Sequence, residues 1–162
     1  MKRDWICCFT GHRNIDGETL QELSKLLDGV LDRLIADGVT VFRTGGALGF
    51  DTLAALKVLE RRATCPSISL ELHLPCRNQT DGWDERSRAY YEYILKQADR
   101  VEYIFDSYVK GCMLARNRHM VDGSQFCIGY CTGDRGGSAY TLDYAKKKGV
   151  RVINLARMLP KM

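Results

Sequence analysis

A membrane-spanning helix needs about 20 successive apolar residues, and this chain has no run that approaches that length. Its first five residues lead directly into a strand-like segment, without the apolar core of a signal peptide. Internal repeats, linkers and low-complexity tracts are also missing from its 162 residues. We therefore expect one domain over residues 1–162, located in the cytoplasm and without a membrane partner.

Cysteine motifs typical of metal sites or disulfide frameworks are missing as well. The seven cysteines are odd in number, and several lie inside apolar runs, as Cys7, Cys8 and Cys127 do. This distribution favours buried, reduced thiols. Cys127 and Cys131 are four residues apart, but no second cysteine pair or histidine cluster accompanies them. The sequence thus predicts no metal site and no required cofactor.

Neither sign of charge is in large excess. The 24 basic and 20 acidic residues give a net charge of +4. That balance is compatible with nucleic-acid binding but does not require it. Hydrophobic residues make up 45% of the chain, which is enough for the core of one globular domain.

Two hydrophobic periodicities alternate along the chain, one helical and one of short apolar runs. They predict strands at residues 6–9, 39–42, 68–74, 101–105, 126–130 and 150–155, and helices at 17–38, 52–59, 83–98, 109–122 and 139–148. Strands separated by helices of this length need crossover connections, which produce parallel pairing. The fold class is therefore α/β, a doubly wound and mostly parallel sheet of about six strands with helices on both faces.

The predicted strand at residues 68–74 differs from the others in its pattern. Apolar and polar residues alternate along it, and it stops at Pro75. Such alternation is typical of a strand with one solvated side, close to a sheet edge. We therefore expect this strand to be half exposed.

Three glycine-containing turns each follow a predicted strand. The turn at residues 43–51 leads into a helix through Gly45, Gly46 and Gly49, and turns at 10–13 and 132–138 repeat the arrangement. Glycine has no Cβ, so an anion can approach the main chain, and the following helix directs its free N–H groups toward that anion. Three such turns suggest one crevice for a nucleotide-like ligand.

The basic residues divide between the two edges of the predicted sheet. In an open α/β sheet the ligand crevice lies beyond the carboxyl ends of the strands. Basic residues that follow predicted strands belong at this edge, and they include His12, Arg13, Arg43 and Arg135. Residues 146–148 instead form a lysine cluster at the end of a predicted helix, on the opposite edge. Positive charge is thus expected to gather where a phosphate would bind.

Four motifs follow one another along the chain, at residues 9–13, 44–51, 116–124 and 136–140. Together they resemble the YpsA-like branch of the SLOG superfamily, a Rossmann-like group that also includes the DNA-processing protein DprA and the LOG phosphoribohydrolases. The resemblance covers nearly the whole chain. It implies a Rossmann-like nucleotide-binding domain whose glycine turns hold a nucleotide or a nucleotide-derived ligand.

The chain departs from two related patterns. LOG enzymes resemble it but carry a Pro-Gly-Gly-x-Gly-Thr-x-x-Glu motif, whose glutamate serves N-glycosidic cleavage. Residues 136–141 occupy the comparable place here, and the nearest carboxylates are those of Asp134 and Asp143. The glycines at 45–49 also do not reproduce the G-x-G-x-x-G fingerprint of dinucleotide-binding domains. The resemblance therefore does not carry over the LOG reaction.

The residues expected to bind the ligand come from the turns and from the 116–124 motif. They are Gly11, His12, Arg13, Arg43, Thr44, Gly45, Gly46, Gly49, Asp51, Arg116, Asn117, Asp134, Arg135, Gly136, Gly137 and Ser138. Asp51 and Asp134 are the catalytic candidates if the protein is an enzyme. Simpler roles stay open, since Asp51 could only cap a helix, His12 could be a surface turn residue, and Arg116 and Asn117 could lie on a solvated helix face.

Three functions are compatible with these residues. The first is a sensor or regulatory module for a nucleotide-derived small molecule. The second is a hydrolase or transferase that acts on an N-glycosidic or phosphate bond of a nucleotide. The third is single-stranded nucleic-acid binding by analogy with DprA. A homo-oligomer is compatible with each of them.

Overall fold

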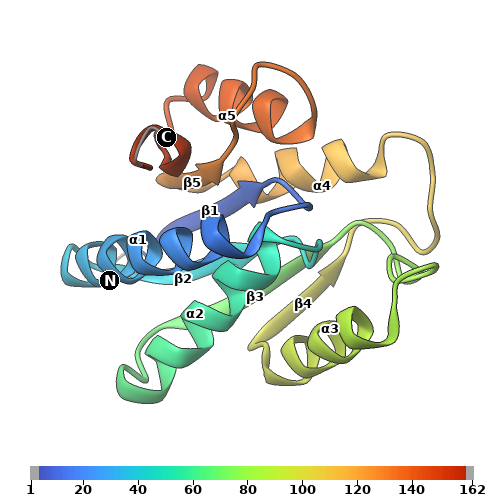
Figure 1. Ribbon diagram of the computed structural model, residues 1–162, viewed down its shortest axis with the longest axis horizontal. Coiled ribbons are helices and arrows are strands. Elements are labelled where there is room, and N and C mark those ends of the chain that lie inside the picture. The colour runs from blue at the N-terminus through green and yellow to red at the C-terminus, as the bar shows by residue number, and fades with distance from the viewer. Residues whose placement is uncertain (1–3, 160–162) are drawn as a thin grey trace.

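The computed structural model describes residues 4–159 as one six-stranded sheet with helices packed against it (Figure 1). The strands are β1 (Trp5–Gly11), β2 (Val39–Thr44), β3 (Ser69–Leu74), β4 (Arg100–Tyr103), β5 (Phe126–Tyr130) and β6 (Arg151–Asn154). The helices are α1 (Gly17–Ala36), α2 (Phe50–Thr64), α3 (Glu85–Gln97), α4 (Cys112–Val121) and α5 (Gly137–Lys147), followed by a 3-10 turn, η1 (Leu155–Arg157).

The sheet has the strand order β4-β3-β2-β1-β5-β6, and every pairing is parallel. The chain adds strands outward from β1 to β4, then returns to the other side of β1 and adds β5 and β6. This confirms the predicted Rossmann-like α/β class. The order reverses between β1 and β5, so the ligand crevice of such a fold lies beyond the carboxyl ends of these two strands.

Side chains alternate between two cores, one on each face of the sheet. Along β1, Cys7 and Phe9 join the core shared with α1, α2 and α3, whereas Cys8 joins the core shared with α4 and α5. Figure 1 shows α4 and α5 together beside β5, while α3 lies next to β4 at the far end of the sheet. The period of two residues in a strand therefore sorts the chain into two apolar layers.

The face of β3 that turns toward α4 differs from the prediction. His73 is only 2% exposed, although alternation of polar residues predicted a half-exposed strand. The imidazole ring of His119, from α4, lies 4.9 Å from that of His73, centroid to centroid. The half-exposed prediction is thus wrong at His73, because helix α4 covers a polar side chain that the pattern alone assigned to solvent.

Within residues 4–159, none of the helices combines the length and the apolar character required to cross a membrane.

Candidate functional site

A pocket of about 490 Å³ opens at the carboxyl edge of the sheet, where the strand order reverses. Its size lies within the range of pockets that enclose small-molecule ligands and cofactors. The walls come from the loop after β1 and from the starts of α2, α4 and α5. The lining residues are Thr10, Gly11, His12, Arg13, Asn14, Ala47, Asp51, Met113, Leu114, Arg116, Asn117, Arg135, Gly136, Gly137 and Ser138.

The helices that reach this pocket begin differently from the others. Helices α2, α4 and α5 have the N-caps Gly49, Gly111 and Gly136, and none of the three receives a side-chain hydrogen bond at its cap. By contrast, α1 and α3 are capped by Asp16 and Asp84, whose carboxylates accept from backbone N–H groups at 2.8 Å and 2.7 Å. Uncapped helix starts carry free N–H donors and partial positive charge. The first N–H of α2, from Phe50, donates to the His12 carbonyl, and that of α4, from Cys112, donates to the Val109 carbonyl. The start of α5, where Gly137 and Ser138 line the pocket, is therefore the part most favourable for an anion.

A buried hydrogen-bond chain connects α4 to the start of α5. Arg116 Nε donates to Asn117 Oδ1 at 2.7 Å, and Arg116 Nη1 donates to the Gly45 carbonyl. Asn117 Nδ2 donates to Thr141 Oγ1 at 2.9 Å, and that hydroxyl donates to the Gly137 carbonyl at 2.7 Å. Arg116 and Asn117 are both buried, so the alternative of a solvated helix face is wrong. These hydrogen bonds together hold the Arg116 guanidinium against the pocket wall.

Two guanidinium groups converge on the sulfur atom of Met113. Arg13 Nη2 lies 3.6 Å and Arg116 Nη2 lies 3.8 Å from Met113 Sδ. Within residues 4–159, neither these arginines nor Arg135 forms an ion pair with a carboxylate. Burial lowers the pKa of Arg116, Asp51 opposes this change, and the nearby Arg13 adds to it. These arginines thus make no direct contact with a carboxylate, although the nearby buried Asp51 offsets part of the charge of Arg116.

Asp51 is the buried carboxylate of the pocket. It lies in the first turn of α2, is 4% exposed, and accepts from the Ala47 N–H at 3.3 Å. The N-cap of α2 is Gly49, so the alternative in which Asp51 only caps that helix is wrong. Burial raises the pKa of Asp51, and the positive charge of Arg116 opposes the rise.

His12 connects the two loops that flank the reversal in strand order. Its Nε2 accepts from the Thr132 N–H at 2.9 Å, so in the neutral ring the proton resides on Nδ1. The ring stands edge-on to Tyr130, with 5.3 Å between centroids. His12 therefore fixes the loop after β1 against the loop after β5, while it also lines the pocket.

The family model named YpsA, described as the YspA SLOG family, matches residues 7–156. The chain belongs to the YpsA family of SLOG proteins. It is 31% identical over 130 residues to UPF0398 proteins of Bacillus thuringiensis (strain Al Hakam) and Bacillus cereus (strain AH187). The aligned region covers 78% of this chain and 71% of each relative.

Two solved structures share the fold of this SLOG chain at low sequence identity. DprA from Streptococcus pneumoniae matches with a TM-score of 0.68 and 19% identity over 92% of this chain and 49% of that protein. DprA from Helicobacter pylori, whose structure concerns a single-stranded DNA binding mode, matches with a TM-score of 0.68 and 20% identity, over 98% and 66%. The chain thus spans about half the length of the S. pneumoniae protein. The predicted relation to DprA is confirmed at the level of the fold.

Ten of the sixteen residues predicted for the site line the pocket of this SLOG domain, namely Gly11, His12, Arg13, Asp51, Arg116, Asn117, Arg135, Gly136, Gly137 and Ser138. Asp134 lies apart from them and lines a neighbouring hollow on the other side of Gly136. The two catalytic candidates, Asp51 and Asp134, are therefore in different cavities. Contact of the ten residues with a ligand stays a prediction.

Arg43 and Thr44 lie within β2, and neither lines the pocket. Arg43 Nε pairs with Glu71 Oε1 at 3.1 Å, and its Nη1 donates to the backbone carbonyls of Met120 and Asp122. The placement of Arg43 after a strand was wrong, because β2 extends two residues beyond its apolar run. Strand alternation then directs the Arg43 side chain toward α4.

The glycines of the 45–49 loop lie behind the pocket wall, and none of them lines it. A Cβ on Gly45 would lie 2.6 Å from Arg116 Cζ, and one on Gly49 would lie 2.6 Å from the His12 carbonyl oxygen. Gly46 adopts a φ of +70° and faces Leu74. These glycines thus make room for Arg116 and for the loop after β1, and direct contact with an anion stays a prediction.

Sequence reasoning missed five residues of the pocket: Thr10, Asn14, Ala47, Met113 and Leu114. Thr10, Asn14 and Ala47 lie within or beside the glycine turns, so proximity to those turns was a usable signal. Met113 and Leu114 give no such signal, since apolar residues at the start of a helix usually belong to a core.

Proposed function

We propose that this protein binds a nucleotide or a related phosphorylated metabolite in this pocket and acts as a sensor or regulatory module. One observation carries the proposal, which is the convergence of Arg13 and Arg116 on Met113 without a carboxylate partner. Guanidinium groups without a direct carboxylate contact, beside the uncapped start of α5, are complementary to phosphate.

The pocket offers separate groups for the two ends of such a ligand. Free N–H groups at Gly137 and Ser138, together with Arg13 and Arg135, suit a phosphate. The Asp51 carboxylate suits a donor such as a ribose hydroxyl. Because Asp51 is buried and, when ionised, carries the same sign of charge as a phosphate, it also disfavours a second phosphate in its part of the pocket.

The hydrolase alternative has one observation in its favour, the raised pKa of Asp51. Burial that raises the pKa of a carboxyl group is one way in which an active site prepares a general acid or base. Glycosidic hydrolysis, however, commonly uses two carboxyl groups on either side of the scissile bond. Asp51 is the one carboxylate among the residues that line the pocket, so binding without turnover is the favoured function.

Calorimetric titration with AMP and ADP-ribose tests the proposal. Arg13→Gln and Arg135→Gln should each weaken binding by roughly 1.5–3 kcal/mol, or about 10- to 150-fold in Kd. The matched control neutralises Lys146, Lys147 and Lys148 together at the end of α5, where none of them lines the pocket, and it should leave Kd nearly unchanged. The reverse ranking, or no binding of either probe, would reject the pocket as a phosphate site.

Turnover and nucleic-acid binding are decided by two further measurements. Release of base or phosphate from these probes, reduced about 10²- to 10⁴-fold by Asp51→Asn, would establish the hydrolase instead. Tight binding of a single-stranded oligonucleotide with steep salt dependence, weakened by the triple lysine variant, would favour the DprA-like function.

A further inference from the structure

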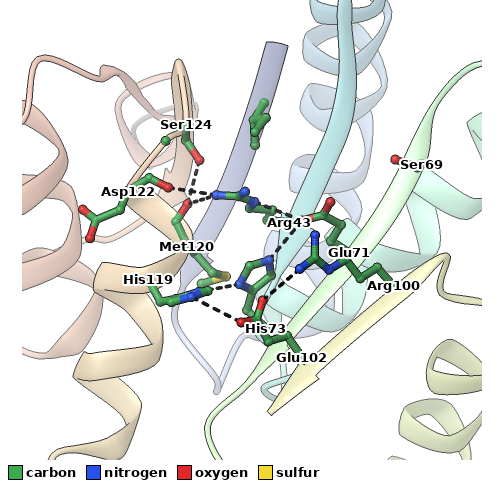
Figure 2. A network of polar contacts seen from close by, with 12 residues as sticks. Arg43, Ser69, Glu71, His73, Arg100, Glu102, His119, Met120, Asp122 and Ser124 are labelled. Carbon is green, nitrogen blue, oxygen red and sulfur yellow. Dashed lines mark hydrogen bonds and ion pairs between the residues drawn. The ribbon is translucent and has the colours of Figure 1, made fainter. Parts of the chain in front are cut away.

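Three potential metal ligands meet on the face of the sheet that α4 covers, apart from the pocket. They are His73 of β3, Glu102 of β4 and His119 of α4, and their ligand atoms all lie within 4.8 Å of one another. Figure 2 shows the three side chains pointing toward one another from these separate elements. None of them lines the pocket described above.

His73 is oriented by a second layer of charged groups. Its Nε2 lies 3.1 Å from Glu71 Oε1, and the same oxygen accepts from Arg43 Nε at 3.1 Å. A carboxylate can only accept, so the Nε2 proton is directed at Glu71 and the Nδ1 lone pair faces away from it. A carboxylate behind a histidine in this way is the usual support of a metal-binding imidazole.

The free Nδ1 of His73 points at a second imidazole nitrogen. His73 Nδ1 and His119 Nδ1 are 2.8 Å apart, close enough that a single proton bridges two lone pairs. Two nitrogens bound to one tetrahedral zinc ion are about 3.3 Å apart, given Zn–N bonds of about 2.0–2.1 Å. His119 has a side chain that is 42% exposed, so its ring has room to turn out of this hydrogen bond and direct a lone pair at an ion.

Glu102 supplies the negative charge that the two rings lack. Its Oε1 lies 3.5 Å from His119 Nε2, and its side chain is 36% exposed. Glu102 therefore faces the second ring nitrogen of His119, and the His119 ring must turn so that a single nitrogen meets the ion together with His73 Nδ1 and Glu102. The competing cation is Arg100, whose Nη2 is 3.8 Å from Glu102 Oε2 and whose side chain is 65% exposed. Such an exposed pair contributes little stability, so Arg100 can move aside, whereas Glu71 is already neutralised by Arg43.

We propose that His73, Glu102 and His119 bind a divalent transition-metal ion, with zinc as the best match. Two imidazoles and one carboxylate suit zinc and its neighbours, whereas Mg²⁺ and Ca²⁺ prefer oxygen ligands throughout. The exposed sides of Glu102 and His119 leave a path to solvent and a coordination position for water. The ion connects the last turn of α4 to β3 and β4.

Equilibrium dialysis of the chelator-treated 162-residue chain against Zn²⁺, Co²⁺ and Mg²⁺ tests this site. We expect one equivalent of Zn²⁺ or Co²⁺ and no Mg²⁺, a visible spectrum of tetrahedral Co²⁺, and a rise in the thermal unfolding midpoint on addition of Zn²⁺. His119→Ala and Glu102→Gln, both at half-exposed positions, should each lose at least tenfold in affinity. Gln has nearly the same shape as Glu, so Glu102→Gln is expected to fold normally. The test therefore still holds if His119→Ala fails to fold.

Two control variants remove groups outside the proposed ligand set, one that contacts Glu102 and one that packs against the other core. Arg100→Gln should bind Zn²⁺ at least as tightly as the parent chain, because it removes the competitor of Glu102. Cys65→Ser removes a half-exposed thiol and should bind equally well. Substoichiometric binding, or binding that survives both His119→Ala and Glu102→Gln, would mean that the two histidines form a hydrogen-bonded pair only.

Discussion

The pocket and the His73–Glu102–His119 cluster lie along the same helix, α4, but treat charge in opposite ways. In the pocket, Arg116 is buried without an ion pair and helix starts are uncapped. In the cluster, the carboxylates of Glu71 and Glu102 both lie within ion-pairing distance of basic groups. The first arrangement is complementary to an anion and the second to a cation, although His119 follows Arg116 by only three positions along one helix.

The strongest way to break the pocket without touching the cluster is Gly49→Ala. Gly49 has a φ of +74°, and its Cβ would meet the carbonyl oxygens of His12 and Arg13, which are backbone atoms that cannot swing away. We expect a loss of roughly 2–5 kcal/mol in the free energy of unfolding, from left-handed strain plus overpacking. Urea denaturation measures it.

The matched control for Gly49 is Gly149→Ala. Gly149 has a similar φ of +79°, but an added Cβ there meets no atom within 4 Å. Only the strain applies, at about 1–2 kcal/mol. Equal losses at the two glycines would show that the loop after β1 is not held by close approach to Gly49.

The converse change is Glu71→Gln, which weakens the cluster and leaves the pocket intact. Glu71 orients His73 through its carboxylate, and loss of such a supporting group typically reduces metal affinity about 10- to 100-fold. Zinc dialysis measures this loss, and calorimetry with AMP should give the Kd of the parent chain. The Arg13→Gln variant should behave in the opposite manner, with zinc affinity unchanged. Parallel losses at both sites would contradict their independence.

The Asp51→Asn variant sharpens the account of charge inside the pocket. Burial raises the pKa of Asp51 above 3.8. At a pH between 3.8 and the pKa of Asp51 in the folded protein, Asp51 is mostly protonated in the folded protein and mostly ionised in the unfolded chain. The free energy of unfolding of the parent chain therefore falls as pH rises across that window. Relative to it, the Asn variant should gain up to about 1.4 kcal/mol per pH unit.

Urea denaturation at several pH values between about 4 and 7 gives this difference. Asp16→Ala is a control of opposite sign, since hydrogen bonds from the backbone and hydroxyl of Thr19 lower the pKa of Asp16. The advantage of the parent chain over that variant should shrink as pH falls below about 4. If the difference in unfolding free energy between Asp51→Asn and the parent chain does not change with pH, then Asp51 is solvated or neutralised by Arg116.

Much of the fold and part of the site followed from local pattern. Alternating periodicities predicted six strands and five helices, with shifts of a few residues at their ends. One such shift is at α4, which begins at Cys112 and not at residue 109, because Gly111 adopts a left-handed conformation that precedes the helix. Glycine turns after β1 and β5 indicated the edge at which the pocket lies. These features depend on neighbours within a few residues, which the sequence displays directly.

The sequence by itself determined the α/β class, the parallel pairing and the ten pocket residues that adjoin recognisable motifs. Only the tertiary structure decided that Arg43 turns away from the pocket toward Glu71, and that His73 meets His119, 46 residues further along. Alternation states which face of a strand a side chain occupies, but strand order and helix placement determine what lies opposite it. The predicted absence of a metal site rested on spacing along the chain, and spacing carries no information about potential ligands, such as His73, Glu102 and His119, that separate elements bring together.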